Sequence, residues 1–182
     1  MMKRVMWLCV VVLMLTGQAC QGCATNSPTP SPTVTVPPTP TPTYSREEAI
    51  EFARAVSAIR TEREVLEKDI DAFSKSSSTM AIEDALRELD GLIKRESDLQ
   101  VRMSEIERPS IPSARAVQDA YLIAFTRDLI AMRVLQEAIA GDQDKLSLLS
   151  VVNIDAMVYS DRAEQTWNRL LETFSITEAE LK

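Results

Sequence analysis

The chain has 182 residues, of which 45% are hydrophobic and 26% are charged, and its formal net charge is −7 at pH 7. It contains no histidine. The commonest general base and metal ligand is therefore missing, which excludes Ser-His-Asp and Cys-His catalysis within the chain. The acidic balance, with a pI of about 4.8 and no evident basic patch, argues against nucleic acid as a partner and favours solubility.

The N-terminus has the three parts of an export signal. Lys3 and Arg4 give a positive start, residues 5–15 are almost entirely apolar, and small residues lead into Cys20. As a helix, an apolar run of about eleven residues would be roughly 16 Å long, which is too short for the ~30 Å core of a bilayer. We therefore predict a signal peptide over residues 1–19 and an extracytoplasmic location.

The residues around the predicted cleavage point carry a family resemblance. Residues 16–20, Thr-Gly-Gln-Ala-Cys, resemble the lipobox of bacterial lipoproteins, with Ala19 before the cysteine as usual and Gly17 where a leucine is usual. The resemblance implies that Cys20 becomes the new N-terminus and is diacylated, with palmitate among the possible chains. It also implies a lipid anchor in a bacterial membrane. The alternative is a plain secretory signal cut after Ala19 or Ala24, which would give a secreted protein.

Residues 20–43 form the next predicted segment, which begins at Cys20 and is rich in proline and threonine. Seven of the nine prolines lie between residues 24 and 43, a stretch without charge. Proline removes backbone donors and biases the preceding residue toward extended conformations, so this stretch favours polyproline II over a packed core. At ~3.1 Å per residue it would reach up to about 60 Å from a membrane surface. We predict a disordered linker.

From Tyr44 onward the sequence predicts four amphipathic helices, because apolar residues recur at alternating spacings of four and three. We expect them over about residues 46–73, 80–107, 114–140 and 142–174. Ser45 and Glu48 have capping-box spacing at the first start. Gly141 can take the left-handed conformation that ends the third helix, and Asp142 can cap the fourth.

These elements predict an all-α domain over residues 44–182, folded as an antiparallel up-down four-helix bundle. Connections of about two to seven residues imply antiparallel neighbours, and roughly 130 residues suffice for one core. An extended coiled coil between chains is the rival, because four-three spacing also suits it. The short connections and the wide apolar face of the third helix favour the bundle within one chain.

Polar residues interrupt the apolar stripes near the middle of each predicted helix. The spacing places Arg63 in the first stripe, Glu96 in the second, Asp128 in the third, and Asn153 or Ser160 in the fourth. Midpoints of antiparallel helices share a level, so one hypothesis is a buried polar layer in which Arg63 meets Glu96 or Asp128. The alternative, which the sequence alone favours, is that these residues lie at stripe edges with their charges in water.

No residue pattern in the chain specifies a reaction. We predict no catalytic residues, no metal site and no cofactor, because histidine is absent and no glycine-rich loop is available to bind phosphate. Tyr121, Tyr159 and Trp167 are candidates for a ligand pocket, although aromatic residues at helical spacing usually fill a core.

Two functions therefore remain at this point. The favoured one is a non-enzymatic binding, scaffolding or envelope-structure module, which is tethered to a membrane through its lipid anchor and has an envelope protein as partner. The alternative is a small-ligand carrier or accessory sensor subunit with its pocket between helices.

Overall fold

The computed structural model describes residues 44–182, so the predicted signal peptide, Cys20 and the linker lie outside the described residues. Within this range the chain forms four long α-helices and two short 3-10 turns, without a strand. The elements are α1 (Arg46–Ser76), η1 (Ser77–Thr79), α2 (Ile82–Glu105), α3 (Pro112–Ile139), α4 (Gln143–Phe174) and η2 (Glu178–Leu181). The prediction of an all-α domain is confirmed.

Side-chain caps fix the starts of α1 and α4. The Ser45 hydroxyl accepts a hydrogen bond from the backbone N–H of Glu48, and the Asp142 carboxylate accepts one from Asp144. Both predicted caps are confirmed. The Glu48 carboxylate, which the capping-box spacing assigned to the start of its own helix, instead accepts hydrogen bonds from the backbone and hydroxyl of Ser110. It thereby ties α1 to the segment that precedes α3.

The helix boundaries differ from expectation where serine and proline occur. The first helix continues beyond Phe73 to Ser76, whose hydroxyl donates back to the carbonyl of Ala72 at 3.1 Å. Such a bond lets serine remain within a helical turn. The third helix begins at Pro112, earlier than predicted, because proline lacks the N–H that a first helical position would leave unpaired.

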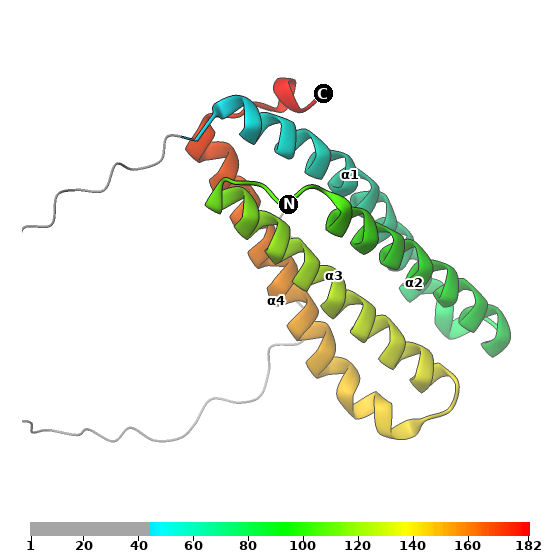
Figure 1. The fold of residues 1–182 in the computed structure, drawn as a ribbon. Helices are drawn as coiled ribbons and strands as arrows, with labels where there is room; N and C mark the ends of the chain where they lie inside the picture. The colour runs from blue at the N-terminus through cyan, green and yellow to red at the C-terminus, as the bar shows by residue number, and fades with distance from the viewer. Residues whose placement is uncertain (1–43) are drawn as a thin grey trace, which may run out of the picture. The chain divides into compact units, whose positions relative to one another are not determined.

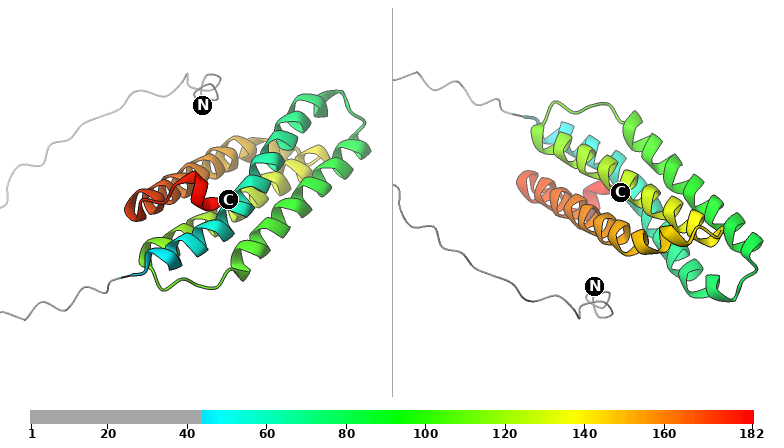
Figure 2. Two further views of the ribbon diagram at one scale, coloured as in Figure 1. Left: turned by 90° about the horizontal axis from the view of Figure 1, so that it is seen from above. Right: turned by 90° about the horizontal axis from the view of Figure 1, so that it is seen from below.

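Each helix contacts the next one along the chain, and the contact between α3 and α4 is the most extensive. Figure 1 shows α1 beside α2 and α3 beside α4, and the two further views in Figure 2 agree. α4 packs mainly against α3 and touches α1 much less. One long face of α4 is therefore left without a neighbouring helix.

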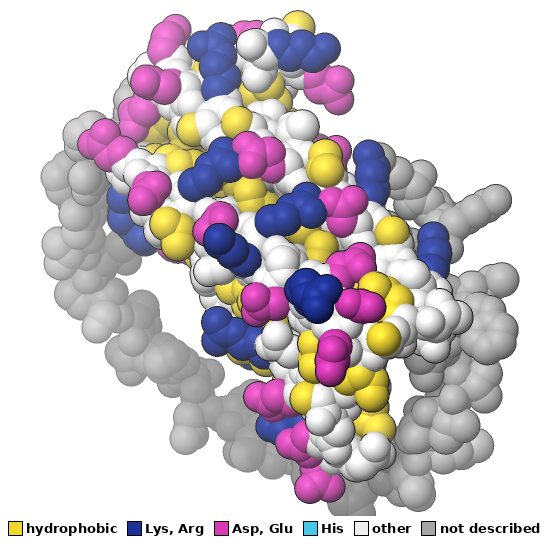
Figure 3. Space-filling view, turned by 90° about the vertical axis from the view of Figure 1, so that its right-hand side faces the viewer, with side chains coloured by type: hydrophobic (Ala, Val, Ile, Leu, Met, Phe, Trp, Pro, Cys, Tyr) yellow, Lys and Arg dark blue, Asp and Glu magenta, His cyan; other side chains and the backbone are white. Residues whose placement is uncertain are grey.

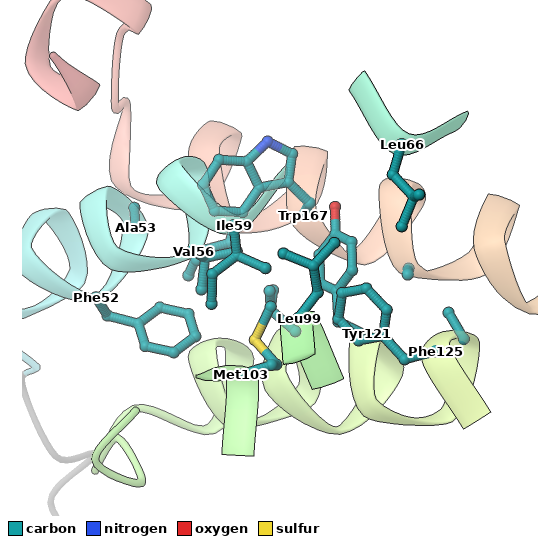
Figure 4. Packing of buried hydrophobic residues seen from close by; sticks show 14 of the residues in the cluster. Phe52, Ala53, Val56, Ile59, Leu66, Leu99, Met103, Tyr121, Phe125 and Trp167 are labelled. Atoms are coloured by element: carbon teal, nitrogen blue, oxygen red, sulfur yellow. The ribbon is translucent and has the colours of Figure 1, made fainter. Parts of the chain in front are cut away.

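The core lies where the four helices converge, and its largest members come from the predicted apolar stripes. Figure 4 shows side chains of all four helices pointing toward one another at this place. Trp167 of α4 and Tyr121 of α3 are almost fully buried there, as are Leu66 of α1 and Met103 of α2. Burial of a large side chain stabilises by about 1.5–3 kcal/mol, so these residues dominate the folding energy.

The two ends of the helical domain are held together by Arg46. Its guanidinium donates to the carbonyls of Phe174 and Ser175, both at 2.9 Å, and to the Glu180 carboxylate. Ser175 has a φ of 50° and so ends α4 in the left-handed conformation. Hydrogen bonds from Thr177 and then from Arg46 lower the pKa of Glu180 to about 2. The start of α1 is thus bound to the last turn of α4 and to η2.

The surface combines interspersed charges with several exposed apolar side chains. Figure 3 shows Lys, Arg, Asp and Glu intermixed over one face, with hydrophobic side chains grouped toward its lower end. Most of the large exposed apolar residues belong to the first half of α4: Leu146, Leu148, Val151, Ile154, Met157 and Val158. Among residues 44–182, no helix is both long and apolar enough to cross a membrane.

The two glycines of the domain provide a matched pair of substitutions. Gly91 lies inside α2 and Gly141 has a φ of 107°, and an added Cβ would meet no atom within 4 Å at either position. Gly91→Ala should therefore stabilise the domain by about 0.5–1 kcal/mol, because alanine loses less backbone entropy in a helix. Gly141→Ala should destabilise it by about 1–2 kcal/mol, because alanine disfavours positive φ.

Urea unfolding of the two variants and the parent measures both effects. The same sign of change in both variants would contradict this account of the two positions.

Candidate functional site

Arg63 of α1 is the centre of a polar network inside the helical domain. Its side chain is 6% exposed, and its Nη2 donates to Asp128 Oδ2 of α3 at 2.6 Å and to Ser160 Oγ of α4 at 2.7 Å. Its guanidinium also lies over the ring of Phe125, 5.2 Å from the ring centroid. Burial alone would lower the pKa of Arg63, but the charges of Asp128, Glu96 and Glu67 raise it. The arginine therefore remains a cation.

Glu96 of α2 is the acidic member of this network that keeps its proton. It is 2% exposed, and burial followed by the charge of Asp128 raises its pKa to about 8, against the opposing effect of Arg63. Its carboxyl lies near that of Asp128, whose pKa is also raised by burial. Two carboxyl groups this close do not both ionise at neutral pH. A protonated Glu96 beside an ionised Asp128 leaves one positive and one negative charge at the centre.

Four of the five residues named for the polar layer come together here. Arg63, Glu96, Asp128 and Ser160 lie at one level of the domain, each from a different helix. Asn153, the other residue named on α4, lies exposed two turns earlier.

A second polar group lies one helical turn from the first and was not identified from the sequence. Arg60 of α1 donates through Nε to the hydroxyl of Tyr121 at 2.7 Å, and it forms an ion pair with Glu164 of α4. The Tyr121 hydroxyl donates to the same glutamate at 2.6 Å. Arg60 is three residues before Arg63, and Glu164 is four residues after Ser160. Extending the polar stripe by one turn on both helices would have found them.

Arginine side chains cover the three aromatic residues that were candidates for a ligand pocket. Arg60 binds Tyr121 and lies 4.8 Å from the ring centroid of Trp167, while Arg127 lies 5.1 Å from that of Tyr159. Burial, followed by the charge of Glu164, raises the pKa of Tyr121, so its hydroxyl stays protonated. Such cation–π contacts fill the space above a ring with protein atoms.

Two hollows on the surface of residues 44–182 measure about 590 and 630 Å³, and both are open to solvent. One lies between α1 and α2 and the other between α3 and α4. Neither is lined by Tyr121, Tyr159 or Trp167. Tyr121 and Trp167 are buried in the core, and Tyr159 is half-buried against it.

Gln118 of α3 is a further buried polar residue that sequence analysis missed. Its amide donates to the carbonyls of Met103 and Ile106 at 3.1 and 2.8 Å, at the end of α2. Helix ends leave carbonyls without partners, so this amide supplies donors that α2 lacks. No local sequence signal indicates such a bond, because the partner residues lie on another helix.

Substitution of Arg63 tests whether the network stabilises the domain. Arg63→Ala removes the cation and leaves Asp128, whose side chain is 20% exposed, without its partner, which should cost about 3 kcal/mol. Arg87→Ala is the matched control, since Arg87 is 76% exposed and forms only a local pair with Asp84. Thermal melts of the two variants should differ clearly. If Arg63→Ala shifts the midpoint no more than Arg87→Ala, Arg63 is not buried with Asp128 in the folded domain.

The raised pKa of Glu96 predicts how stability depends on pH. Above pH 4.5 an unfolded glutamate loses its proton, whereas folded Glu96 keeps it until about pH 8, so the contribution of Glu96 to stability is greatest below about pH 4.5 and falls across this window. Asp128 shifts in the same direction and Arg63 stays charged throughout. Few other groups titrate between about pH 5 and 8, because the chain has no histidine.

Glu96→Gln should flatten this dependence and should make the variant more stable than the parent above about pH 8. Unfolding by urea at a series of pH values measures it, with Glu88→Gln, an exposed position on the same helix, as control. Parallel pH profiles for the parent and Glu96→Gln would show that Glu96 does not hold a proton in the folded state.

The chain was compared with protein-family models, with curated proteins and with solved structures. No family model, no curated protein and no solved structure matches it. Its function has therefore to be inferred from its own residues and from the contacts between them.

Proposed function

We propose that this chain is a lipid-anchored extracytoplasmic protein of a bacterial envelope, whose helical domain is a non-enzymatic binding or scaffolding module. The export signal, Cys20 in its lipobox-like context and the proline-rich segment that follows support the anchor. Two acyl chains on one cysteine hold a protein on a membrane much more firmly than a single chain does. The linker then separates the helical domain from the bilayer surface.

One observation favours a module that acts through its surface over a carrier of small ligands. Arg60 and Arg63 are paired with carboxylates and lie over the rings of Trp167 and Phe125, so their side chains occupy space beside residues that were candidates for a pocket. A carrier of small apolar ligands needs an enclosed cavity of several hundred Å³. The filled interior therefore favours contact with other macromolecules over carriage of a ligand.

We further propose that the four helices form an antiparallel up-down bundle. Ion pairs between neighbouring helices support this topology, because residue numbers rise on one helix as they fall on the other. Arg102 pairs with Glu62 and Arg95 pairs with Asp69 between α2 and α1. In such a bundle both ends are free of long crossover connections, which leaves the outer helix faces available for partners.

Mass spectrometry of the mature N-terminus tests the anchor. We expect a chain that begins at Cys20 and carries acyl groups, and Cys20→Ala should move the protein out of the membrane fraction. Cys23→Ser is the matched control, because it changes a neighbouring cysteine without altering the proposed anchor. An unmodified N-terminus at Cys20 or Thr25 in the native host would end the lipoprotein proposal.

Native mass spectrometry of the same preparation distinguishes the module from the carrier. A surface module should show the mass of the acylated polypeptide and of specific assemblies. A small molecule bound in a one-to-one ratio would instead favour the carrier.

A further inference from the structure

The first half of α4 carries an apolar face that no other helix covers. Leu148, Val151, Ile154, Met157 and Val158, here called the α4 apolar face, are each between 45% and 63% exposed. Val151, Ile154 and Val158 recur at spacings of three and four and so form one stripe. On the other side of the same helix segment, Ala156 is buried against the domain.

Large apolar side chains that gather on an exposed helix face usually mark a surface that a partner covers. Between Lys145 and Asp161 the only charged residue is Asp155, and its carboxylate is paired with Arg127 of α3 at 3.1 Å. Ile123 and Ile130 lie four residues before and three residues after this arginine, and both are exposed. The surface therefore continues from α4 onto α3, and its single ion pair is neutral overall.

The charges at the two borders of this face are arranged symmetrically. The face runs from Leu148 to Val158, so its midpoint is residue 153. Asp144 and Arg162 lie nine residues before and after this midpoint, and both are exposed. Lys145 and Asp161 lie eight residues before and after it. Each border therefore carries one acidic and one basic residue. For each of these residues, the other border has a residue of opposite charge at the same distance from residue 153.

We propose that two copies of this chain associate through their α4 apolar faces, with the two α4 helices antiparallel about a two-fold axis near residue 153. This arrangement brings Asp144 of one copy opposite Arg162 of its partner, twice, because residues 18 apart lie on the same side of a helix. A two-fold interface must be complementary to itself, and this distribution of charge meets that requirement. Lys145 pairs with Glu137 of α3 and so lies outside the contact.

The available area fits a dimer of modest affinity. Residues 143–158 form about 24 Å of helix, and the outward half of a cylinder about 11 Å wide presents roughly 400 Å². Two copies would bury about 800 Å² from α4, and the exposed isoleucines of α3 raise this toward the ~1,200 Å² of small specific interfaces. Confinement of both copies to one membrane would raise their effective concentration, although the association does not depend on the anchor.

A bilayer is a poorer occupant of the same face. Helices that lie in a membrane interface carry many Lys and Arg residues and use Trp or Phe as apolar anchors. The segment from Gln143 to Arg162 has two basic and three acidic residues and neither of these aromatic residues. Without Lys3 and Arg4 the chain keeps 18 of its 20 basic residues against 27 acidic ones, a net charge of −9. Anionic lipids would repel such a surface.

Site-directed cross-linking tests the proposed geometry. The test uses a full chain with Cys23→Ser. In it, Ile154→Cys places a thiol about one residue from the two-fold axis, so the thiols of two copies are separated by roughly 3 Å along α4. Gln165→Cys lies on the same helix, and its two copies would be about 36 Å apart along α4. Intact cells of the host are treated with a short bis-maleimide, and cells and medium are analysed together.

We expect a covalent dimer for Ile154→Cys and little or none for Gln165→Cys. The parent without an introduced cysteine shows whether Cys20 itself reacts, so failure of the lipid anchor is seen separately from failure of the dimer. Equal cross-linking at both positions, or none at Ile154→Cys, overturns the proposal. Protection of Ile154→Cys from a soluble maleimide without cross-linking would identify the bilayer as the occupant.

A charge exchange tests the pairing across the axis. In the Ile154→Cys chain, Arg162→Glu places two acidic residues opposite each other and should lower the cross-linked fraction several-fold. Adding Asp144→Lys restores opposite charges and should restore the cross-linked fraction. All three positions are exposed, so these variants leave the core unchanged. A double variant that cross-links no better than Arg162→Glu alone would overturn the antiparallel register.

Discussion

Burial of the Arg63 guanidinium constrains how the helices of the domain are positioned relative to one another. Taking a cation out of water costs several kcal/mol unless hydrogen bonds and an opposite charge replace the lost hydration. Here α3 supplies the Asp128 carboxylate and α4 supplies the Ser160 hydroxyl. The partners of Arg63 come from two helices, so α3 and α4 must both lie at the correct level relative to α1. The network adds little net stability, but a shift of one helix along another would leave a buried charge without partners.

The same residues divide the domain into two parts. Beyond Ser160 toward the C-terminus, α4 contacts α1 through Glu164 and Trp167, and the interior there is filled by aromatic rings under arginines. Before Ser160, α4 packs mainly against α3 and presents apolar side chains to solvent. One part is therefore fixed by polar and aromatic contacts from all sides. The other carries the surface through which we infer that the protein meets a second copy.

The sequence predicted the helices well because their signals are local. Apolar periodicity located all four, and Ser45, Asp142 and Gly141 marked ends that the structure has. The polar interruptions at Arg63, Glu96 and Asp128 were visible too, yet the sequence alone favoured placing their charges in water. Burial depends on how helices approach each other, which periodicity does not encode. For the same reason the sequence did not predict the exposed face of α4. The apolar pattern of a helix is the same whether or not a neighbouring helix covers it.

The contacts of Arg46 determine how the helical domain would respond to a pulling force at its N-terminus. Under the proposed tether, any pull from the membrane enters the helical domain at Tyr44, directly before α1. Arg46 is among the first side chains to resist, and its partners are the carbonyls of Phe174 and Ser175 together with Glu180. Tension would thus pass at once from the start of the domain to its C-terminal end. Because α1 is fastened to the final turn of α4, it would resist being peeled away while the chain is drawn along the cell surface.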